Sequence, residues 1–155
     1  MTINEHAYGS PSDVAALVPR YATVGGVFDT TTRPTLATVE TQVNQVSALA
    51  NSLISNAGFV VPISQADAKL ALDIFINEEV AAIAEGINGS GRFGPTTKEP
   101  GRSRFAIIMD DLRTFIQANK QGWVNLGVPT FTSEVESISA GVIALDFADH
   151  NEEVF

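Results

Sequence analysis

Three glycines at positions 89, 91 and 94, in the stretch GSGRFG, have the G-x-G-x-x-G spacing of a dinucleotide-binding loop. Such a loop holds a pyrophosphate only where a buried strand leads into it and the N-terminus of a helix follows. Here an expected helix precedes the glycines, Pro95 follows at once, and the Gly-Lys-Ser/Thr ending of a Walker loop is missing. The context therefore argues against nucleotide binding, and we expect no cofactor.

Other residues that could do catalytic chemistry are badly placed for it. The two histidines, His6 and His150, lie in polar surroundings without the serine and carboxylate pattern of a triad. The pairs Glu78-Glu79 and Asp110-Asp111 fall on expected helices, where adjacent side chains diverge, so we expect both pairs to be solvated. The acids around His150 match no calcium or zinc motif. We therefore expect neither an enzyme nor a metal site.

The basic residues offer a binding role instead of a catalytic one. Glycines and prolines predict a mobile loop over residues 88–102, and positive charge gathers there and just beyond it. Such a segment can contact an acidic partner or passing nucleic acid. The solubility of an exposed loop explains the same charges equally well. The candidate contacts to a partner or to DNA are Arg92, Lys98, Arg102 and Arg104.

The whole chain is acidic, with a formal net charge of −9 from 18 acids and 9 bases. This balance argues against a primary role in binding nucleic-acid phosphates, because such binding needs a basic face. With 155 residues, 45% of them hydrophobic, the chain is long enough for one cooperative core. The absence of cysteine excludes disulfides. We find neither a membrane-spanning run nor a secretory leader, and we expect a soluble, unexported protein.

Hydrophobic spacing predicts a mainly α fold, a small bundle of one short and three longer helices. The stretch GSPSDVAALVPRY predicts the short helix, with Ser10 or Ser12 as its cap and Pro19 ending it. A glycine and threonine-rich loop follows. The longer helices are expected over residues 35–56, with Gly58 as the stop, over 64–87, and over 103–121, with Gly122 near the end.

Two of these helices have unusual faces. On 35–56, the face opposite the apolar one is polar but nearly uncharged, so either solvent or a neighbouring subunit covers it. On 64–87, apolar residues cover most of the circumference and leave a narrow stripe of Lys69, Asp73 and Asn77. That helix is then either central in the bundle or in contact with another copy. The candidate interface residues are Gln42, Gln45, Ser52, Leu70, Ile74 and Phe75.

Residues 123–155 differ in character from the helical domain expected over 1–122. This stretch lacks lysine and arginine and alternates weakly through Ile143, Leu145 and Phe147. It predicts an extended C-terminal arm of possible β character. Because a lone strand is unstable in water, these three residues are also candidate contacts with a partner surface.

Three stretches together resemble a known family: AYGSPSDVAALVPRY, PTLATVETQVNQVSALANSLISNAGF and VPISQADAKLALDIFINEEVAAIAEGINGSGRFG. They are similar to the head-to-tail connector (adaptor) proteins of long-tailed double-stranded DNA bacteriophages. In that family a short N-terminal helix, a Thr/Pro-rich approach, and two long helices joined through a GF-x-x-P turn recur. The resemblance covers roughly residues 7–94 and leaves out the C-terminal arm, since many relatives stop soon after the last helix.

The resemblance implies a structural virion protein without catalytic residues. Family members add to the portal vertex as a ring, usually of twelve copies, extend the DNA channel and present a surface to the next stopper or tail component. The implied partners are other copies of the chain, the portal protein and a stopper or tail-side protein, with possible non-specific contact with channel DNA and no membrane. The implied location is the head–tail interface of the virion, after assembly in the host cytoplasm. The segment 135–147 is then expected to pair with a neighbouring subunit or a tail-side protein.

A different class of function also fits a small helical chain. A regulatory or DNA-packaging factor would bind nucleic acid or a protein partner. Its discriminating feature is a basic face, which the net charge of −9 disfavours.

Overall fold

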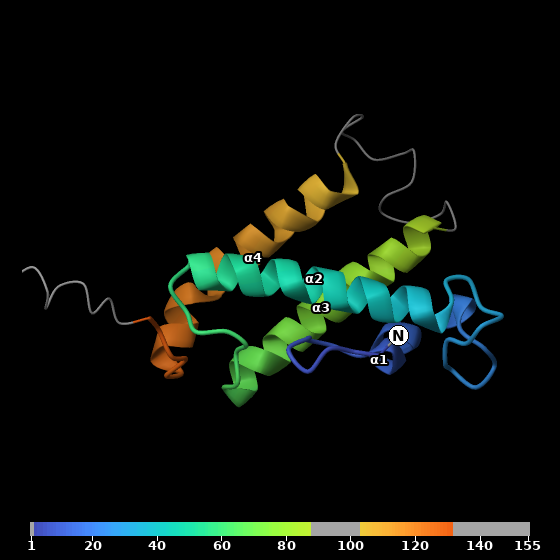
Figure 1. Cartoon of the computed structure of the whole chain (residues 1–155), viewed down its shortest axis with the longest axis horizontal. Helices are drawn as coiled ribbons and strands as arrows, with labels where there is room; N and C mark the ends of the chain where they lie inside the picture. The colour runs from blue at the N-terminus through green and yellow to red at the C-terminus, as the bar shows by residue number, and fades with distance from the viewer. Residues whose placement is uncertain (1, 88–102, 132–155) are drawn as a thin grey trace, which may run out of the picture.

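The computed structural model describes residues 2–87 and 103–131, and within them the fold is mainly helical (Figure 1). The helices are α1 (Pro11–Leu17), a 3-10 turn η1 (Pro19–Tyr21), α2 (Leu36–Asn56), α3 (Ala66–Ile87) and α4 (Arg104–Asn125). These described residues contain no strand, only an isolated antiparallel bridge between Phe59 and Thr130. The predicted fold class of one short and three longer helices is confirmed.

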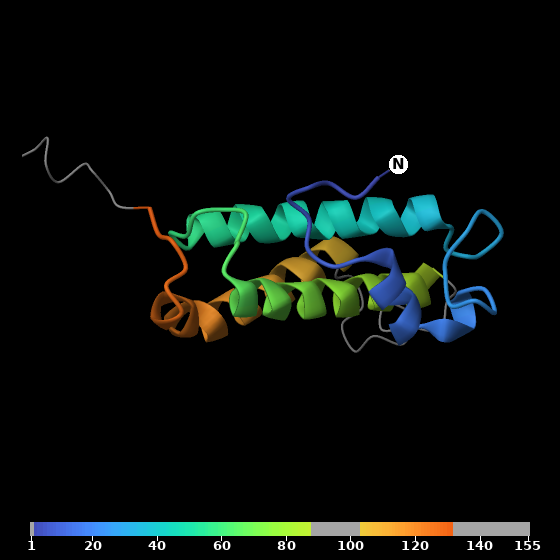
Figure 2. The ribbon, with the colours of Figure 1, turned by 90° about the horizontal axis from the view of Figure 1, so that it is seen from below.

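Helix α2 lies at the centre of the helix packing. It packs against α1, α3 and α4, and α1 packs in addition against α3. Seen from below, α2 forms one layer, and α1 and α3 lie in the other (Figure 2). The first residues of the chain run along the outer side of α2 before they turn down to α1 (Figure 2).

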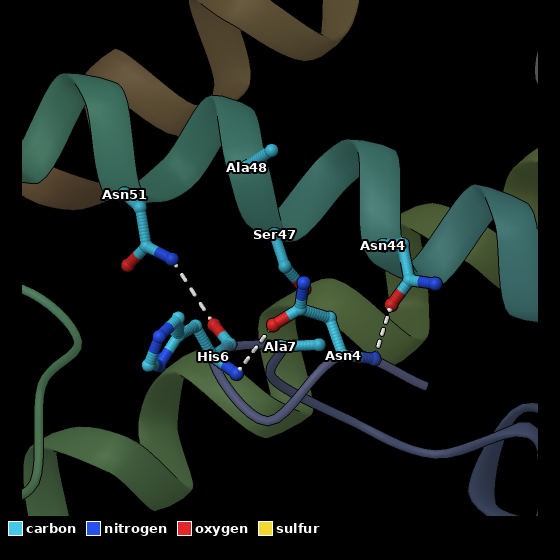
Figure 3. Close-up of a pocket in the computed structure, with 7 residues that line it drawn as sticks. All are labelled: Asn4, His6, Ala7, Asn44, Ser47, Ala48 and Asn51. Carbon is cyan, nitrogen blue, oxygen red and sulfur yellow. Dashed lines mark hydrogen bonds between the residues drawn. The ribbon is translucent and has the colours of Figure 1, made fainter. Parts of the chain in front are cut away.

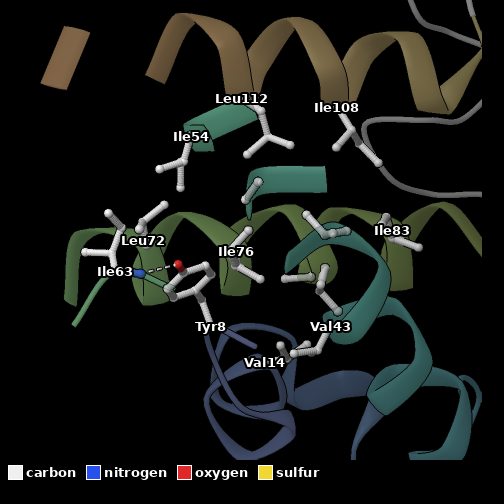
Figure 4. Packing of buried hydrophobic residues seen from close by; sticks show 14 of the residues in the cluster. Tyr8, Val14, Val43, Ile54, Ile63, Leu72, Ile76, Ile83, Ile108 and Leu112 are labelled. Carbon is white, nitrogen blue, oxygen red and sulfur yellow. Dashed lines mark hydrogen bonds between the residues drawn. The ribbon is translucent and has the colours of Figure 1, made fainter. Parts of the chain in front are cut away.

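The core lies where these helices meet, and the predicted helical spacing supplies it (Figure 4). Val39, Val43, Val46 and Ala50 of α2 are buried at steps of four and three residues, as expected. The next buried position is Ile54, and its neighbour Leu53 is only half-buried. Helices α3 and α4 complete the core with Leu72, Ile76, Val80, Ile83, Ile108, Leu112, Ile116 and Trp123.

The loop before α2 is held by its own polar residues. The Asp29 carboxylate accepts hydrogen bonds from the Thr31 hydroxyl and N–H, both at 2.7 Å, and from the Thr32 N–H at 3.0 Å. The bonds from Thr31 hold the pKa of Asp29 below its usual range. Thr35 then caps α2 by accepting the N–H of Thr38.

Helices α2 and α4 end in the same way, each with a glycine in the left-handed region. Gly58 has a φ of +96° and Gly127 a φ of +75°. After Gly58, the Phe59 N–H donates to the carbonyl of Ile54, which closes a Schellman motif. At the end of α4, the Val128 N–H donates to the carbonyl of Trp123 in the same way. The Phe59 and Trp123 rings meet edge to face, 5.5 Å apart. The two helix ends are thereby packed together.

The predicted end of the last helix was wrong. Helix α4 continues past Gly122 to Asn125, and Trp123, expected to begin the arm, is 2% exposed and part of the core. A glycine inside a helix costs about 1 kcal/mol relative to alanine, whereas burying a large aromatic side chain gains more. The expected domain boundary after residue 122 therefore falls inside a helix, and residues 132–155 of the predicted arm lie outside the described residues.

Two alanine substitutions in this region should have opposite effects. Gly122 lies within α4, and a Cβ at this position would meet only open space, so Gly122→Ala should raise the free energy of unfolding by about 0.5–1 kcal/mol. Gly127 has a positive φ, so Gly127→Ala should lower it by about 1 kcal/mol. Urea denaturation of both variants checks this. Destabilisation by Gly122→Ala would contradict the continuous helix.

Candidate interaction surfaces

Two of the predicted apolar interface residues of α3 stay at the surface. Leu70 is 57% exposed and Ile74 is 53% exposed, although both are large and aliphatic. The third, Phe75, is partly buried, and its ring lies 4.5 Å from that of Phe115 in α4. Helix α3 is therefore buried on one side and keeps an apolar edge on the other, and Phe75 serves the bundle.

Leu70 and Ile74 border a shallow groove between α1 and α3, here called the α1–α3 groove, with a volume of about 380 Å³. Leu17, at the end of α1 and 51% exposed, supplies its other apolar wall. Acidic residues stand among the lining, including Asp13 and Glu78, which are both exposed. The groove combines an apolar floor with an acidic rim.

The polar stripe of α3 fixes α1 as one wall of this groove. Asp73 accepts the N–H of Gly9 at 2.8 Å, and Asn77 accepts the N–H of Ser10 at 3.0 Å. A Cβ on Gly9 would collide with Asn77 Oδ1, and Gly9 has a φ of +81°. Lys69 pairs with Asp73 at 2.8 Å. The stripe therefore binds the start of α1 through main-chain groups.

The acidic pairs do not both behave as expected. Glu78 is exposed, but Glu79 is only 3% exposed, so the expectation that this pair is solvated was wrong for Glu79. Its position follows Leu72 and Ile76 at helical spacing, which places it on the buried face of α3. Asp110 and Asp111 are half-buried on α4. Among residues 2–87 and 103–131, no group of three or more His, Cys, Asp or Glu could hold a metal ion.

The polar face of α2 is covered in part by the chain itself. Gln42 is half-buried, while Gln45 and Ser52 are exposed and stay available to a neighbour. Beside them, three polar residues that the sequence analysis did not single out bind residues 2–8 (Figure 3). They are Asn44, Ser47 and Asn51, spaced by three and four, and this spacing was the signal that could have revealed them.

These three side chains, here called the α2 ladder, hold main-chain groups of every second residue. Asn44 accepts the N–H of Asn4 at 2.8 Å and donates to the carbonyl of Thr2 at 3.1 Å. Asn51 donates to the carbonyl of His6 at 3.0 Å. Ser47 accepts the N–H of Tyr8 at 2.9 Å and donates to its carbonyl at 3.2 Å. Residues 2–8 therefore lie along α2, with a turn at Glu5 and His6 that is closed by a hydrogen bond from the Ala7 N–H to the Asn4 carbonyl at 3.0 Å.

Tyr8 is the buried end of this segment, with 1% of its surface exposed. Its hydroxyl donates to Asn51 Oδ1 at 2.7 Å and accepts the N–H of Ile63 at 2.8 Å, which joins α2 to the α2–α3 connection (Figure 4). Burial raises the pKa of the Tyr8 phenol above its ordinary value. His6, by contrast, is exposed, as the sequence predicted for a solvated histidine.

The predicted basic cluster is described at one residue only. Arg104 is the half-buried first residue of α4. Arg92, Lys98 and Arg102 lie outside the described residues, and so do Ile143, Leu145 and Phe147 of the predicted arm. Within the described part of the chain, no helix is long and apolar enough to cross a membrane.

Comparison of the chain with models of protein families, with curated proteins and with solved structures finds no match.

Replacing Tyr8 with phenylalanine keeps the buried ring and removes the hydroxyl, so it measures what the hydroxyl alone contributes to stability. Tyr8→Phe leaves the buried Ile63 N–H without its acceptor, so the free energy of unfolding at neutral pH should fall by about 1–3 kcal/mol. Because the folded pKa is raised, the natural protein should lose Tyr8-linked stability as the pH rises through about 10 and upward. Tyr8→Phe should lack that alkaline loss.

Urea denaturation at about pH 8 and about pH 11 measures both effects. Tyr21→Phe, at the second tyrosine of the chain, controls for the removal of a phenol elsewhere. An equal alkaline loss in Tyr8→Phe and in the natural protein would contradict this role of Tyr8.

Proposed function

We propose that the protein is a head-to-tail connector (adaptor) of a long-tailed double-stranded DNA bacteriophage. It forms a ring on the portal vertex, for which the resemblance implies twelve copies. The ring extends the DNA channel and gives the stopper or tail protein a docking surface. The observation that carries the proposal is the exposed α1–α3 groove on a helical bundle of the kind that the resemblance implies.

The groove has the properties of a protein-binding surface. Leu17, Leu70 and Ile74 are all more than half exposed, and clustered exposed aliphatic side chains mark sites of association. The hydrogen bonds of the α3 polar stripe to Gly9 and Ser10 fix the position of α1, so the two walls of the groove are preformed. The acidic rim disfavours nucleic acid as the ligand of this groove, because phosphates are repelled.

A closed ring needs a second, different surface on each copy, since its interfaces are heterologous. The second half of α4 fits the groove in charge. This half carries Lys120 and Arg113, which pairs with Asp110 at 3.3 Å, and residues 112–126 contain no acid. Val124 and the C-cap residue Leu126 are 48% and 43% exposed. No residue of α4 lines the groove. In the proposed ring, each copy offers its groove to one neighbour and its α4 face to the other.

Polar substitutions in the groove should prevent assembly without unfolding the bundle. Leu70→Gln combined with Ile74→Gln should weaken self-association by about tenfold or more, because the aliphatic area buried at the interface is lost. The free energy of unfolding of the monomer should change by less than about 0.5 kcal/mol, as both sites are exposed. Light-scattering mass measurement, alone and with the portal protein of the same phage, reports the assembly.

Val27→Gln is the matched control, because Val27 is 51% exposed but lies in the loop before α2. This variant should assemble like the natural protein. A monomer that assembles only on the portal fits the proposal, since such components order on docking. A natural protein that stays monomeric and never associates with the portal would contradict it.

A further inference from the structure

We propose that residues 132–138, which follow the last described residue, dock into a groove between α2 and α4 of their own chain. This groove, here called the α2–α4 groove, has a volume of about 320 Å³. The proposal goes beyond the connector role, and the groove shares no lining residue with the α1–α3 groove. The lining residues of the α2–α4 groove are Leu53, Asn56, Ala57, Arg113, Ile116 and Gln117.

The α2–α4 groove has an apolar floor and a polar rim. Ile116 is buried and Leu53 is half-buried, whereas Asn56 and Gln117 are exposed. A side-chain amide both donates and accepts hydrogen bonds, so the two rim amides suit the main-chain groups of a bound peptide segment. The groove therefore has the chemistry of a site for an extended stretch of chain.

Arg113 gives this groove its charge, since it is the one charged residue among those that line it. Its side chain is 59% exposed, and it pairs with Asp110 on the same helix at 3.3 Å. An exposed ion pair of this kind contributes little to stability, so Arg113 can also bind another carboxylate. An acidic segment therefore fits the groove better than a basic one.

The described chain ends beside this groove and runs toward it. The Val60 N–H donates to the carbonyl of Pro129 at 2.8 Å, and the Phe131 N–H donates to the carbonyl of Gly58 at 2.9 Å. As the chain advances from Pro129 to Phe131, its bonding partner thus moves from Val60 back to Gly58. The next residue in that direction is Ala57, which lines the groove. Figure 1 and Figure 2 both show the end of the described chain at the C-terminal end of α2.

The sequence of the segment matches the groove in charge and pattern. Residues 132–138 read TSEVESI, with two acids and no base. Neighbouring side chains of an extended chain point to opposite sides, which suits Val135 to the floor and Glu134 and Glu136 to the rim. Glu134 follows Phe131 by three residues, which span about 10 Å and are long enough to enter the groove.

Docking also has a consequence for assembly, and this consequence rests on the proposed function. Arg113 belongs to the α4 face that is proposed to meet the acidic rim of a neighbour's α1–α3 groove. The acidic segment and the neighbour then compete for Arg113. A docked segment therefore weakens the self-association of the free chain.

The absence of native cysteine allows a direct test. In the groove pair, Gln117→Cys with Ser137→Cys, one thiol lies at the groove and the other in the segment. In the control pair, Val60→Cys with Ser137→Cys, the first thiol is exposed and lies two residues from Gly58, in the direction away from the groove. Equilibrium with glutathione, in protein dilute enough to be monomeric, gives the effective concentration of each thiol pair. We expect the groove pair to exceed the control pair by about tenfold or more.

Charge variants of the groove pair test the role of Arg113. Arg113→Gln should lower its effective concentration by about threefold, because the segment loses its cationic partner. Lys120→Gln removes one positive charge from the same helix outside the groove lining and should leave the value unchanged. An equal effect of the two substitutions overturns the assignment of Arg113.

The assembly assay tests the competition. Glu134→Gln with Glu136→Gln should strengthen self-association by about threefold, because the competing segment is weakened. Glu152→Gln with Glu153→Gln removes the same charge farther along the chain and should have no effect. Self-association that does not increase in the first variant overturns the competition.

The mass of the oxidised products separates the outcomes for docking. Equal effective concentrations in the groove pair and the control pair overturn it. Disulfide-linked dimers in place of intrachain disulfides also overturn it, and assign the segment to another copy, as the resemblance implies for residues 135–147. Neither measurement depends on ring assembly. A chain that never associates with the portal therefore overturns the connector role, while docking is decided by the thiol pairs alone.

Discussion

The buried hydroxyl of Tyr8 is the contact on which the arrangement of the bundle depends. It accepts the N–H of Ile63 from the α2–α3 connection and donates to Asn51 of α2, while its main chain is held by Ser47. A buried polar group is costly unless it is bonded, and here each bond satisfies a group from a different segment. Tyr8 therefore fixes where the chain enters the core and how α2 sits over α3.

The fixed position of Tyr8 sets the surfaces on both sides of it. After Tyr8, Gly9 and Ser10 donate to Asp73 and Asn77, which places α1 along α3 and forms the α1–α3 groove. Before Tyr8, the chain runs over α2, where its main-chain groups bond the side chains of Asn44 and Asn51, and Ile3 and Ala7 pack against the core. One buried residue thus links the segment that lies on α2 to the groove that is proposed to bind a neighbour.

The role proposed for the α1–α3 groove is one of association. The exposed aliphatic residues of the groove gain free energy only when another surface covers them. This proposed role follows from the shape and apolar area of the groove, which are what a component of a ring needs from its subunit contacts.

The sequence by itself determined the helices, because apolar spacing and capping residues act locally: Ser10, Thr35 and Gly58 mark helix ends as expected. It also marked Leu70 and Ile74 as apolar residues in excess of one small core. Tertiary structure decided what each face meets. Helix α4 continues past Gly122 because the Trp123 side chain is buried in the core, and Glu79 is buried as well. Asn44, Ser47 and Asn51 bind a segment that lies 39 to 45 residues away in sequence. Spacing along a helix fixes which residues share a face, but only the packing of distant segments determines which face is covered.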